Sequence, residues 1–255
     1  MFKTKKSLGQ NFLIDNNIIN KIVNSVRVLN DEKILEIGPG IGYLTKELKK
    51  FNVNLKSFEI DLDTKKYLDL LIDDKTSIIY NDFMKINLND YYSKDDKIHV
   101  IANIPYYITT PIIEKIIDSK LNILDMTLMV QKEVADRLSS SPRNSNYGYI
   151  TVYLNYYYDV NKLFNVDKNC FNPVPKVDSA IIQLKKKEHN YQVDEELFFK
   201  LIKDSFKLKR KNLRNNLKDY DLDKINEVLN KYNLDLTARA EELSLEIFID
   251  IANNL

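Results

Sequence analysis

The sequence predicts an α/β fold with a mostly parallel sheet, followed by a smaller helical domain. The first observation is an alternation of short apolar runs with segments of helical periodicity, which is typical of strands joined by crossover helices. The second is the length of 255 residues, which suffices for one such domain and a small second one. The expected strands lie near residues 34–37, 55–59, 77–80, 98–102 and 124–130, and the expected helices near residues 43–51, 62–72, 109–118 and 131–138.

The rest of the chain divides into a pair of strands and a helical region. Two further apolar runs, near residues 150–158 and 177–185, have no obvious helix between them, so we expect an antiparallel hairpin at the sheet edge. From about residue 192 onward the periodicity is helical and describes about three short helices. We therefore expect a first domain over residues 1–190 and an all-helical domain over residues 191–255.

The composition is that of an ordinary globular protein, with 44% hydrophobic and 29% charged residues. No apolar stretch approaches the roughly 20 residues that span a bilayer, and no apolar signal-peptide core follows the basic N-terminus. We therefore expect a cytoplasmic location. One cysteine, Cys170, and two histidines far apart in the sequence, His99 and His189, suggest neither a disulfide framework nor a metal site.

An apolar strand that runs into glycines, KILEIGPGIG over residues 33–42, indicates a cofactor site. Gly38 and Gly40 let a ligand approach the backbone closely. The Gly-x-Gly-x-Gly spacing departs from the dinucleotide fingerprint and favours S-adenosylmethionine over NAD or FAD. Glu59, at the end of the next expected strand, is placed to accept both ribose hydroxyls, although its spacing suits either cofactor. Asp82, after the third strand, can accept a hydrogen bond from the adenine amino group of the cofactor.

The tetrapeptide Asn103-Ile104-Pro105-Tyr106 follows the fourth strand and fits the binding of a planar base. An adenine N6 amine is a poor nucleophile because its lone pair is delocalised, so a methylating enzyme needs acceptors for its N–H groups. The Asn103 side-chain oxygen and the Ile104 carbonyl supply such acceptors. Pro105 restricts the turn, and Tyr106 offers a ring for a flipped base. Taken alone, the tetrapeptide fits an ordinary strand-to-helix turn equally well.

The net charge of +1 conceals a strongly basic segment at residues 206–218. Apolar residues run through the same stretch, which predicts an amphipathic helix with a cationic face, suited to a phosphate backbone. A solvated helix face is the plain alternative. The segment has no acidic residue and contains the basic residues Lys207, Lys209, Arg210, Lys211, Arg214 and Lys218.

Over nearly its full length, the chain resembles the bacterial small-subunit (16S) rRNA adenine N6,N6-dimethyltransferases, the KsgA/RsmA family. The matching blocks are KSLGQNFL at 6–13, EIGPGIG at 36–42, NIPY at 103–106, QKEVADRL at 131–138 and FNPVPKVDS at 171–179. Residues 211–217 and 239–246 match this family better than the related large-subunit, macrolide-resistance enzymes.

The resemblance implies a Rossmann-like class I S-adenosylmethionine-dependent methyltransferase sheet with a small C-terminal helical domain. The implied activity is dimethylation of two adjacent adenosines in the 3′-end hairpin loop of small-subunit rRNA, coupled to subunit biogenesis. The implied partner is rRNA within a pre-30S particle, with a monomeric enzyme, no membrane and no metal. Phe171 would form a second aromatic wall around the flipped adenine. The implied cofactor contacts are Asn11, Leu13, Gly38, Glu59, Asp82 and Asn103.

One position departs from the family pattern, and other functions stay open. Tyr107 stands where this family typically has Asn, which changes the polarity behind the stacking ring. The first alternative is a large-subunit (23S) rRNA methyltransferase of the macrolide-resistance type. The second is a mainly non-catalytic ribosome assembly factor, and an NAD-linked oxidoreductase is the plain α/β alternative.

Overall fold

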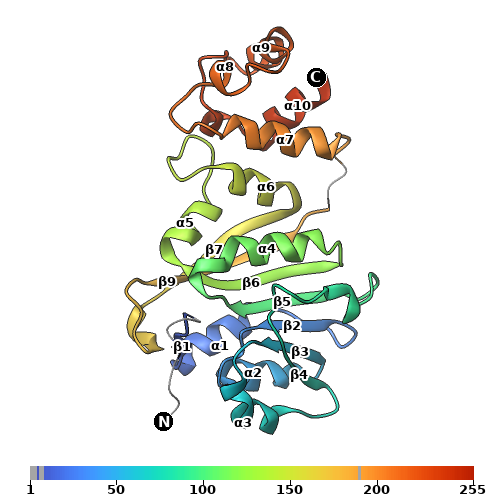
Figure 1. Ribbon diagram of the computed structural model, residues 1–255, viewed down its shortest axis with the longest axis vertical. Helices are drawn as coiled ribbons and strands as arrows, with labels where there is room; N and C mark the ends of the chain where they lie inside the picture. The colour runs from blue at the N-terminus through green and yellow to red at the C-terminus, as the bar shows by residue number, and fades with distance from the viewer. Residues whose placement is uncertain (1–4, 6–8, 189–190) are drawn as a thin grey trace. The chain divides into compact units, whose positions relative to one another are not determined.

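The computed structural model describes residues 5, 9–188 and 191–255, and the chain divides into two compact units (Figure 1). Unit 1 comprises Met1–Ala135 and Asn161–Lys186, and unit 2 comprises Asp136–Val160 and Lys187–Leu255. The expected boundary at residue 190 lies close to Lys187, but residues 136–160 belong to unit 2 and not to the first domain. The reason is packing, since Tyr147, Val152 and Tyr156 are buried in one hydrophobic cluster with the C-terminal helices.

Unit 1 contains a seven-stranded sheet of order β4-β3-β2-β5-β6-β9-β7. Five neighbouring strands, β4, β3, β2, β5 and β6, run parallel to one another, and β9 runs antiparallel to β6. This arrangement confirms the predicted α/β class. Residues 98–102 of β5 are buried on both faces, so this strand reads as a continuous apolar run. The bounds are β2 Lys33–Ile37, β3 Asn54–Glu59, β4 Thr76–Tyr80, β5 Ile98–Asn103, β6 Ile123–Gln131, β7 Tyr158–Val166 and β9 Ser179–Lys186.

Helices cover both faces of this sheet. Helices α1 (Asn16–Asn24) and α2 (Tyr43–Leu48) pack against one face, where they share a hydrophobic cluster with strand residues such as Ile34 and Leu55. Helix α4 (Thr109–Asp118) buries Ile112, Ile113 and Ile116 and lies in front of the sheet in Figure 1. Smaller elements are α3 (Lys65–Leu68), α5 (Lys132–Leu138) and the two-stranded antiparallel pair of β1 (Phe12–Leu13) and β8 (Phe171–Asn172).

Unit 2 is helical, and its helices enclose a separate hydrophobic cluster. Asp194 and Asp221 cap α7 and α9, where their side chains accept hydrogen bonds from backbone N–H groups of the first turn. No helix among the described residues is long and apolar enough to cross a membrane. The helices are α6 (Tyr149–Tyr157), α7 (Glu195–Ser205), α8 (Leu213–Asn216), α9 (Leu222–Lys231) and α10 (Leu245–Asn254).

Two predictions of secondary structure were also wrong. The expected strand at 150–158 is helix α6, because its aromatic and β-branched side chains are buried on several sides and hide the helical period. The expected helix over 206–218 is mostly a chain of turns, with only the short α8 in it. The Asn216 amide explains this, since it donates to the Ser205 carbonyl (2.7 Å) and accepts from the Leu208 N–H (3.1 Å). Such side-chain bonds compete with the helical ladder.

Candidate active site

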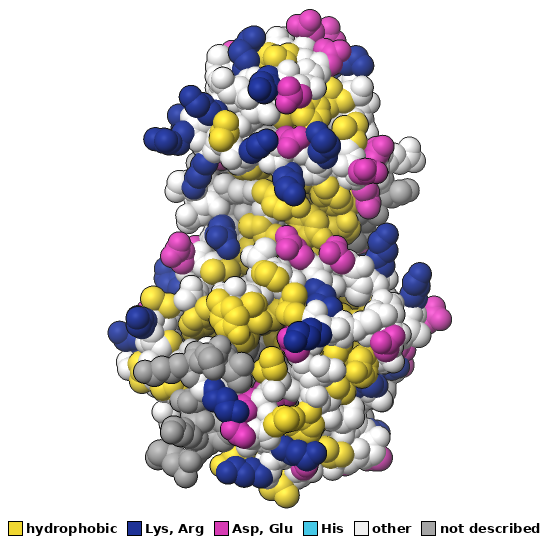
Figure 2. Space-filling view, in the orientation of Figure 1, with side chains coloured by type: hydrophobic (Ala, Val, Ile, Leu, Met, Phe, Trp, Pro, Cys, Tyr) yellow, Lys and Arg dark blue, Asp and Glu magenta, His cyan; other side chains and the backbone are white. Residues whose placement is uncertain are grey.

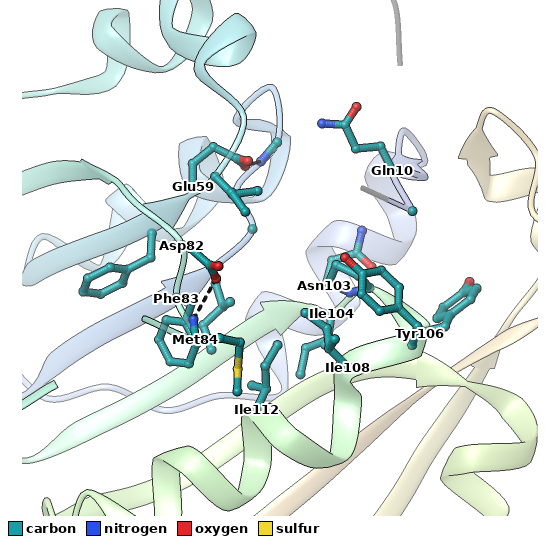
Figure 3. Close-up of a pocket in the computed structure, with 18 of the residues that line it drawn as sticks. Gln10, Glu59, Asp82, Phe83, Met84, Asn103, Ile104, Tyr106, Ile108 and Ile112 are labelled. Carbon is teal, nitrogen blue, oxygen red and sulfur yellow. Dashed lines mark hydrogen bonds between the residues drawn. The ribbon is translucent and has the colours of Figure 1, made fainter. Parts of the chain in front are cut away.

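A cavity of about 250 Å³ opens at the carboxyl ends of the parallel strands in unit 1. The residues at the ends of β2, β3, β4 and β5 all contribute to its lining, as expected for a ligand site in an open α/β sheet. Figure 3 shows Glu59 and Asp82 on one side of the cavity and Asn103 and Tyr106 on the other. The cavity therefore brings together residues from segments far apart in the sequence.

The glycine loop after β2 forms one wall. Gly40 has φ of +61°, and a Cβ added there would lie 2.7 Å from ring atoms of Phe12. Only glycine lets the loop adopt this conformation while the Phe12 ring packs on it. Gly38, with φ of +67°, lines the cavity as well, so both glycines stand where the sequence predicted a close backbone approach.

Glu59 ties this loop to the end of β3. Its Oε2 accepts the Gly40 N–H at 2.9 Å, and its Oε1 accepts the Asp61 N–H at 2.8 Å. The side chain is buried, with 5% exposed. Burial raises the pKa of Glu59, and the backbone N–H groups of Asp61 and Gly40 oppose that shift. Both donors are neutral, and no cation in the described part of the chain is paired with this carboxylate.

Asp82 is the second acid in the cavity wall. Its Oδ1 accepts the Met84 N–H at 2.9 Å, which fixes the turn after β4 (Figure 3). Phe83 and Met84 beside it contribute apolar surface to the same cavity. No Lys or Arg is among the described residues that line the cavity. Two acids without a cation suit a positively charged cofactor such as S-adenosylmethionine, whereas the two phosphates of a dinucleotide would find no counter-charge.

The amide of Asn103 is held in a fixed orientation at the end of β5. Its Nδ2 donates to the Asn11 carbonyl at 3.1 Å, and no described residue donates to its Oδ1. The Ile104 N–H is engaged with the Met129 carbonyl at 3.3 Å, and Pro105 continues the turn with φ of −56°. The side-chain oxygen of Asn103 is therefore held in place without a described donor, and its role as an acceptor for the target amine stays a prediction.

Tyr106 lies beside this amide, with its ring in the cavity wall. The hydroxyl of Tyr106 and Oγ of Ser179 in β9 are 2.6 Å apart, so the far end of the ring is fixed. Burial raises the pKa of Tyr106, so the phenol stays protonated near neutral pH. The ring is half-buried and offers a flat surface next to the Asn103 acceptor.

Two predicted site residues lie elsewhere. Leu13 and Phe171 face each other in the register of β1 and β8, and they are 6% and 2% exposed. Both belong to the hydrophobic cluster that packs α1 and α2 on the sheet. Neither lines the cavity, so this structure does not bring Phe171 opposite Tyr106 as a second aromatic wall.

Sequence reasoning also missed two polar residues of the cavity lining, Asn81 and Gln10, of which Gln10 has the more informative contacts. Gln10 lies in the segment that leads to β1. Its Nε2 donates to Oδ2 of the buried Asp61 at 2.6 Å, and its Oε1 accepts the Lys5 N–H at 2.8 Å. The Lys5 ammonium also lies 2.5 Å from Asp61. Burial would raise the pKa of Asp61, but Lys5 and Gln10 outweigh it and lower that pKa. The signal in the sequence was Asp61, an acid two positions after Glu59. Asp61 binds Lys5 and Gln10 and so holds the N-terminal segment at the cavity.

The basic segment belongs to unit 2, and all of its cationic side chains are exposed. Leu213 and Leu217 from the same segment are fully buried and anchor it to the helical core. Lys209 donates to the Ser145 carbonyl at 3.2 Å. Among the residues that the structure describes, no group of His, Cys, Asp and Glu has the arrangement of a metal site.

Comparison with known proteins places the chain among RNA-modifying enzymes. A family model described as ribosomal RNA adenine dimethylase matches residues 1–255. The protein "Ribosomal RNA small subunit methyltransferase A" of Oceanobacillus iheyensis is 38% identical over 268 residues, which cover 99% of this chain and 90% of that protein.

Solved structures give the same grouping. A dimethyladenosine transferase from Plasmodium falciparum superposes with a TM-score of 0.79 at 26% identity, covering 94% of this chain and 95% of that one. The 23S rRNA methyltransferase ErmE superposes with a TM-score of 0.75, covering 96% of this chain and 99% of that one. Its identity is 24%, so it speaks for the fold alone. These likenesses confirm the predicted Rossmann-like class I methyltransferase fold.

Proposed function

The chain belongs to the ribosomal RNA adenine dimethylase family, and we propose that it dimethylates the N6 amines of two adjacent adenosines in the 3′-end hairpin loop of small-subunit rRNA. The observation that carries this proposal is the Asn103 amide, which the Asn11 carbonyl holds in a cavity that also contains the Tyr106 ring. A fixed acceptor beside an aromatic surface is what a flipped adenine requires.

S-Adenosylmethionine is the methyl donor, and when bound it supplies an electrophilic methyl group on a sulfonium centre. The cavity residues fit it: Gly38 and Gly40 allow close approach, and two carboxylates face a cavity in which no described lining residue is a cation. We propose that Glu59 accepts the ribose hydroxyls and that Asp82 accepts the adenine amino group. Asn11 and Asn103 border the remaining part of the cavity, where the methionyl portion would lie.

The protein's own contribution is to orient the target amine. The Asn103 Oδ1 and the Ile104 carbonyl accept the two N6–H groups, which draws the nitrogen lone pair away from the ring and towards the methyl group. Tyr106 holds the plane of the base by stacking. Once the amine is alkylated it becomes acidic, so its proton passes to water without a general base. The monomethylated base has the same plane and can bind again.

The exposed basic segment of unit 2 supplies the contact to RNA phosphates. Replacing Lys207, Arg210 and Lys211 by Ala should weaken binding to small subunits and flatten the salt dependence, by roughly one unit of slope per lost phosphate contact. Lys209 is not replaced in this variant, because it donates a hydrogen bond to the Ser145 carbonyl. A matched triple change of exposed unit 2 lysines outside the segment, at Lys203, Lys224 and Lys231, should leave the slope unchanged. Equal slopes in all three proteins would make this segment a solvated surface.

The cellular setting follows from the substrate. We propose that the enzyme acts as a monomer in the cytoplasm, on rRNA within a pre-30S particle, and that methylation is coupled to small-subunit biogenesis.

Transfer of radiolabelled methyl groups to purified small and large ribosomal subunits, with mapping of the modified nucleotides, tests the proposal. The expected result is two dimethyladenosines in small-subunit rRNA with the parent protein and none with Asn103→Ala. Label in the large subunit would identify a macrolide-resistance type of enzyme. Tight binding to small subunits without label would favour an assembly factor.

A further inference from the structure

Tyr107 lines the cavity and is 64% exposed. It follows Tyr106 in the short 3₁₀ turn Tyr106–Ile108. Single exposed apolar side chains are common on protein surfaces, so exposure alone says little. What distinguishes Tyr107 is that its ring stands at the cavity mouth and is supported on one side.

The support comes from Gly9. A Cβ added at Gly9 would lie 3.2 Å from Cε1 and 3.5 Å from Cδ1 of Tyr107, so one edge of the ring occupies the space that a side chain at Gly9 would need. The same Cβ would lie 3.8 Å from Cβ of Pro105, so the proline of the turn borders this position as well. The Cδ1–Cε1 edge of the Tyr107 ring therefore lies against the Gly9 position, while most of the side chain stays open to solvent. A ring held in this way loses little entropy when a ligand stacks on it.

We propose that Tyr107 stacks on the base next to the target adenosine. The inference rests on the proposed function, because it needs a substrate in which one base leaves the stack. Flipping the target into the cavity deprives its neighbour of a stacking partner, and a held aromatic ring at the mouth replaces it. Successive side chains of a 3₁₀ turn point about 120° apart, so Tyr106 and Tyr107 serve two different bases.

The proposal gives Tyr107 a part in substrate choice. A purine offers a larger stacking surface than a pyrimidine, so a purine neighbour is preferred. In a substrate with two adjacent adenosines, each is the neighbour of the other. Tyr107 would then bind the second adenosine while the first is methylated.

Steady-state methylation of small subunits by Tyr107→Ala, Tyr107→Leu and Tyr107→Phe tests this assignment. Ala and Leu should raise KM for the subunit about tenfold, because stacking on an aromatic ring is lost in both. Phe should stay within about twofold of the parent. Equilibrium binding of S-adenosylmethionine should not change in any variant. Tyr232→Ala, which removes an exposed tyrosine of unit 2 that does not line the cavity, is the matched control.

Removal of the neighbouring base gives the second test. Equilibrium binding is measured with short RNA hairpins that carry the two adenosines, either intact or with an abasic nucleotide on one side of the target. The parent should bind the intact hairpin about tenfold more tightly than Tyr107→Ala does, and the two should bind one of the abasic hairpins equally.

The outcomes separate this inference from the proposed function. If the parent fails to methylate small subunits, the proposed function is wrong. If the parent methylates them but Tyr107→Ala has the parental KM, only the stacking assignment is overturned. The stacking assignment is also overturned if Tyr107→Leu has the parental KM, or if Tyr107→Ala loses affinity for the cofactor and not for RNA.

Discussion

Carboxylates are buried at both ends of the parallel strands, which we call the amino edge and the carboxyl edge of the sheet. Their negative charge is compensated in opposite ways at the two edges. At the amino edge, His99 Nε2 lies 2.8 Å from Glu32 and Nδ1 lies 2.9 Å from Asp125. At the carboxyl edge, Glu59 accepts the backbone N–H groups of Gly40 and Asp61, and no cation among the described residues pairs with it. In the first arrangement both acids have an imidazole nitrogen as partner, whereas the second leaves a carboxylate for a ligand.

This difference shows why similar residues at the two ends of the same strands have different roles. A buried acid with an internal cation contributes to stability and has little to offer a ligand. A buried acid held by neutral donors keeps its charge and part of its lone pairs, and a bound cation or hydroxyl can use both. The compensation of the charge therefore distinguishes a structural site from a binding site better than burial does.

The largest effect is expected at the amino edge. His99→Leu leaves Glu32 and Asp125 buried without their partner, so the free energy of unfolding should fall by about 3 kcal/mol. Urea unfolding of parent and variant measures this. Affinity for S-adenosylmethionine, measured on folded protein, should stay near the parental value. An unchanged unfolding midpoint would mean that water replaces the imidazole at no cost.

The difference in the free energy of unfolding between the parent and His99→Leu should depend on pH. Burial would lower the pKa of His99, but the hydrogen bonds to Asp125 and Glu32 outweigh it and raise that pKa. A raised histidine pKa gives stability that is complete below about pH 6.5 and is lost as the pH rises through the folded-state value. The advantage of the parent over His99→Leu should therefore shrink on the alkaline side of pH 6.5.

At the carboxyl edge, Asn103→Ala should reduce methyl transfer by roughly 10²-fold or more. The reason is that removing one oriented polar group that acts mainly in the transition state typically lowers the rate by about that factor. Binding of S-adenosylmethionine should stay within about tenfold of the parent. Single-turnover methylation and equilibrium binding on the same preparation separate the two quantities, and equal losses in both would contradict the assignment.

Glu59→Gln sharpens the comparison by keeping shape and removing charge. Its amide can accept only one of the two N–H bonds from Gly40 and Asp61, so cofactor affinity should fall about tenfold. In the parent, affinity should also fall as the pH drops through the raised pKa of Glu59, whereas Glu59→Gln should show no such step. Isothermal titration across pH 5 to 8 would show whether the charge matters.

The smallest effect is expected for Tyr106→Phe. It removes the hydroxyl contact with Ser179 but keeps the ring, so activity should fall only about twofold, whereas Tyr106→Ala should cost about tenfold through lost stacking. Methylation rates at saturating cofactor measure both. A severe loss with Phe would assign the hydroxyl a role beyond fixing the ring.

The sequence predicted most of the sheet and most of the cavity, because both depend on local patterns. The strands end where apolar runs end, and the site residues Gly38, Glu59, Asp82 and Asn103 follow those ends. What failed depends on tertiary packing. Helix α6 hides its period because it is buried on several sides. The role of Phe171 as an aromatic wall stays a prediction, and in this structure Phe171 is buried opposite Leu13. Gln10 was missed because its partner Asp61 lies 51 residues away.

The pairing of β1 with β8 has a consequence for synthesis of the chain. Asn11, which orients the Asn103 amide, directly precedes β1, and β1 is completed only by residues 171 and 172. During translation the Asn103 amide therefore reaches its final orientation only after β8 has been synthesised. We expect a nascent chain that lacks β8 to have no methyl-transfer activity. Ribosome-stalled chains of increasing length would show activity appearing only after β8 has left the exit tunnel. Earlier activity would mean that Asn11 reaches its place without β8.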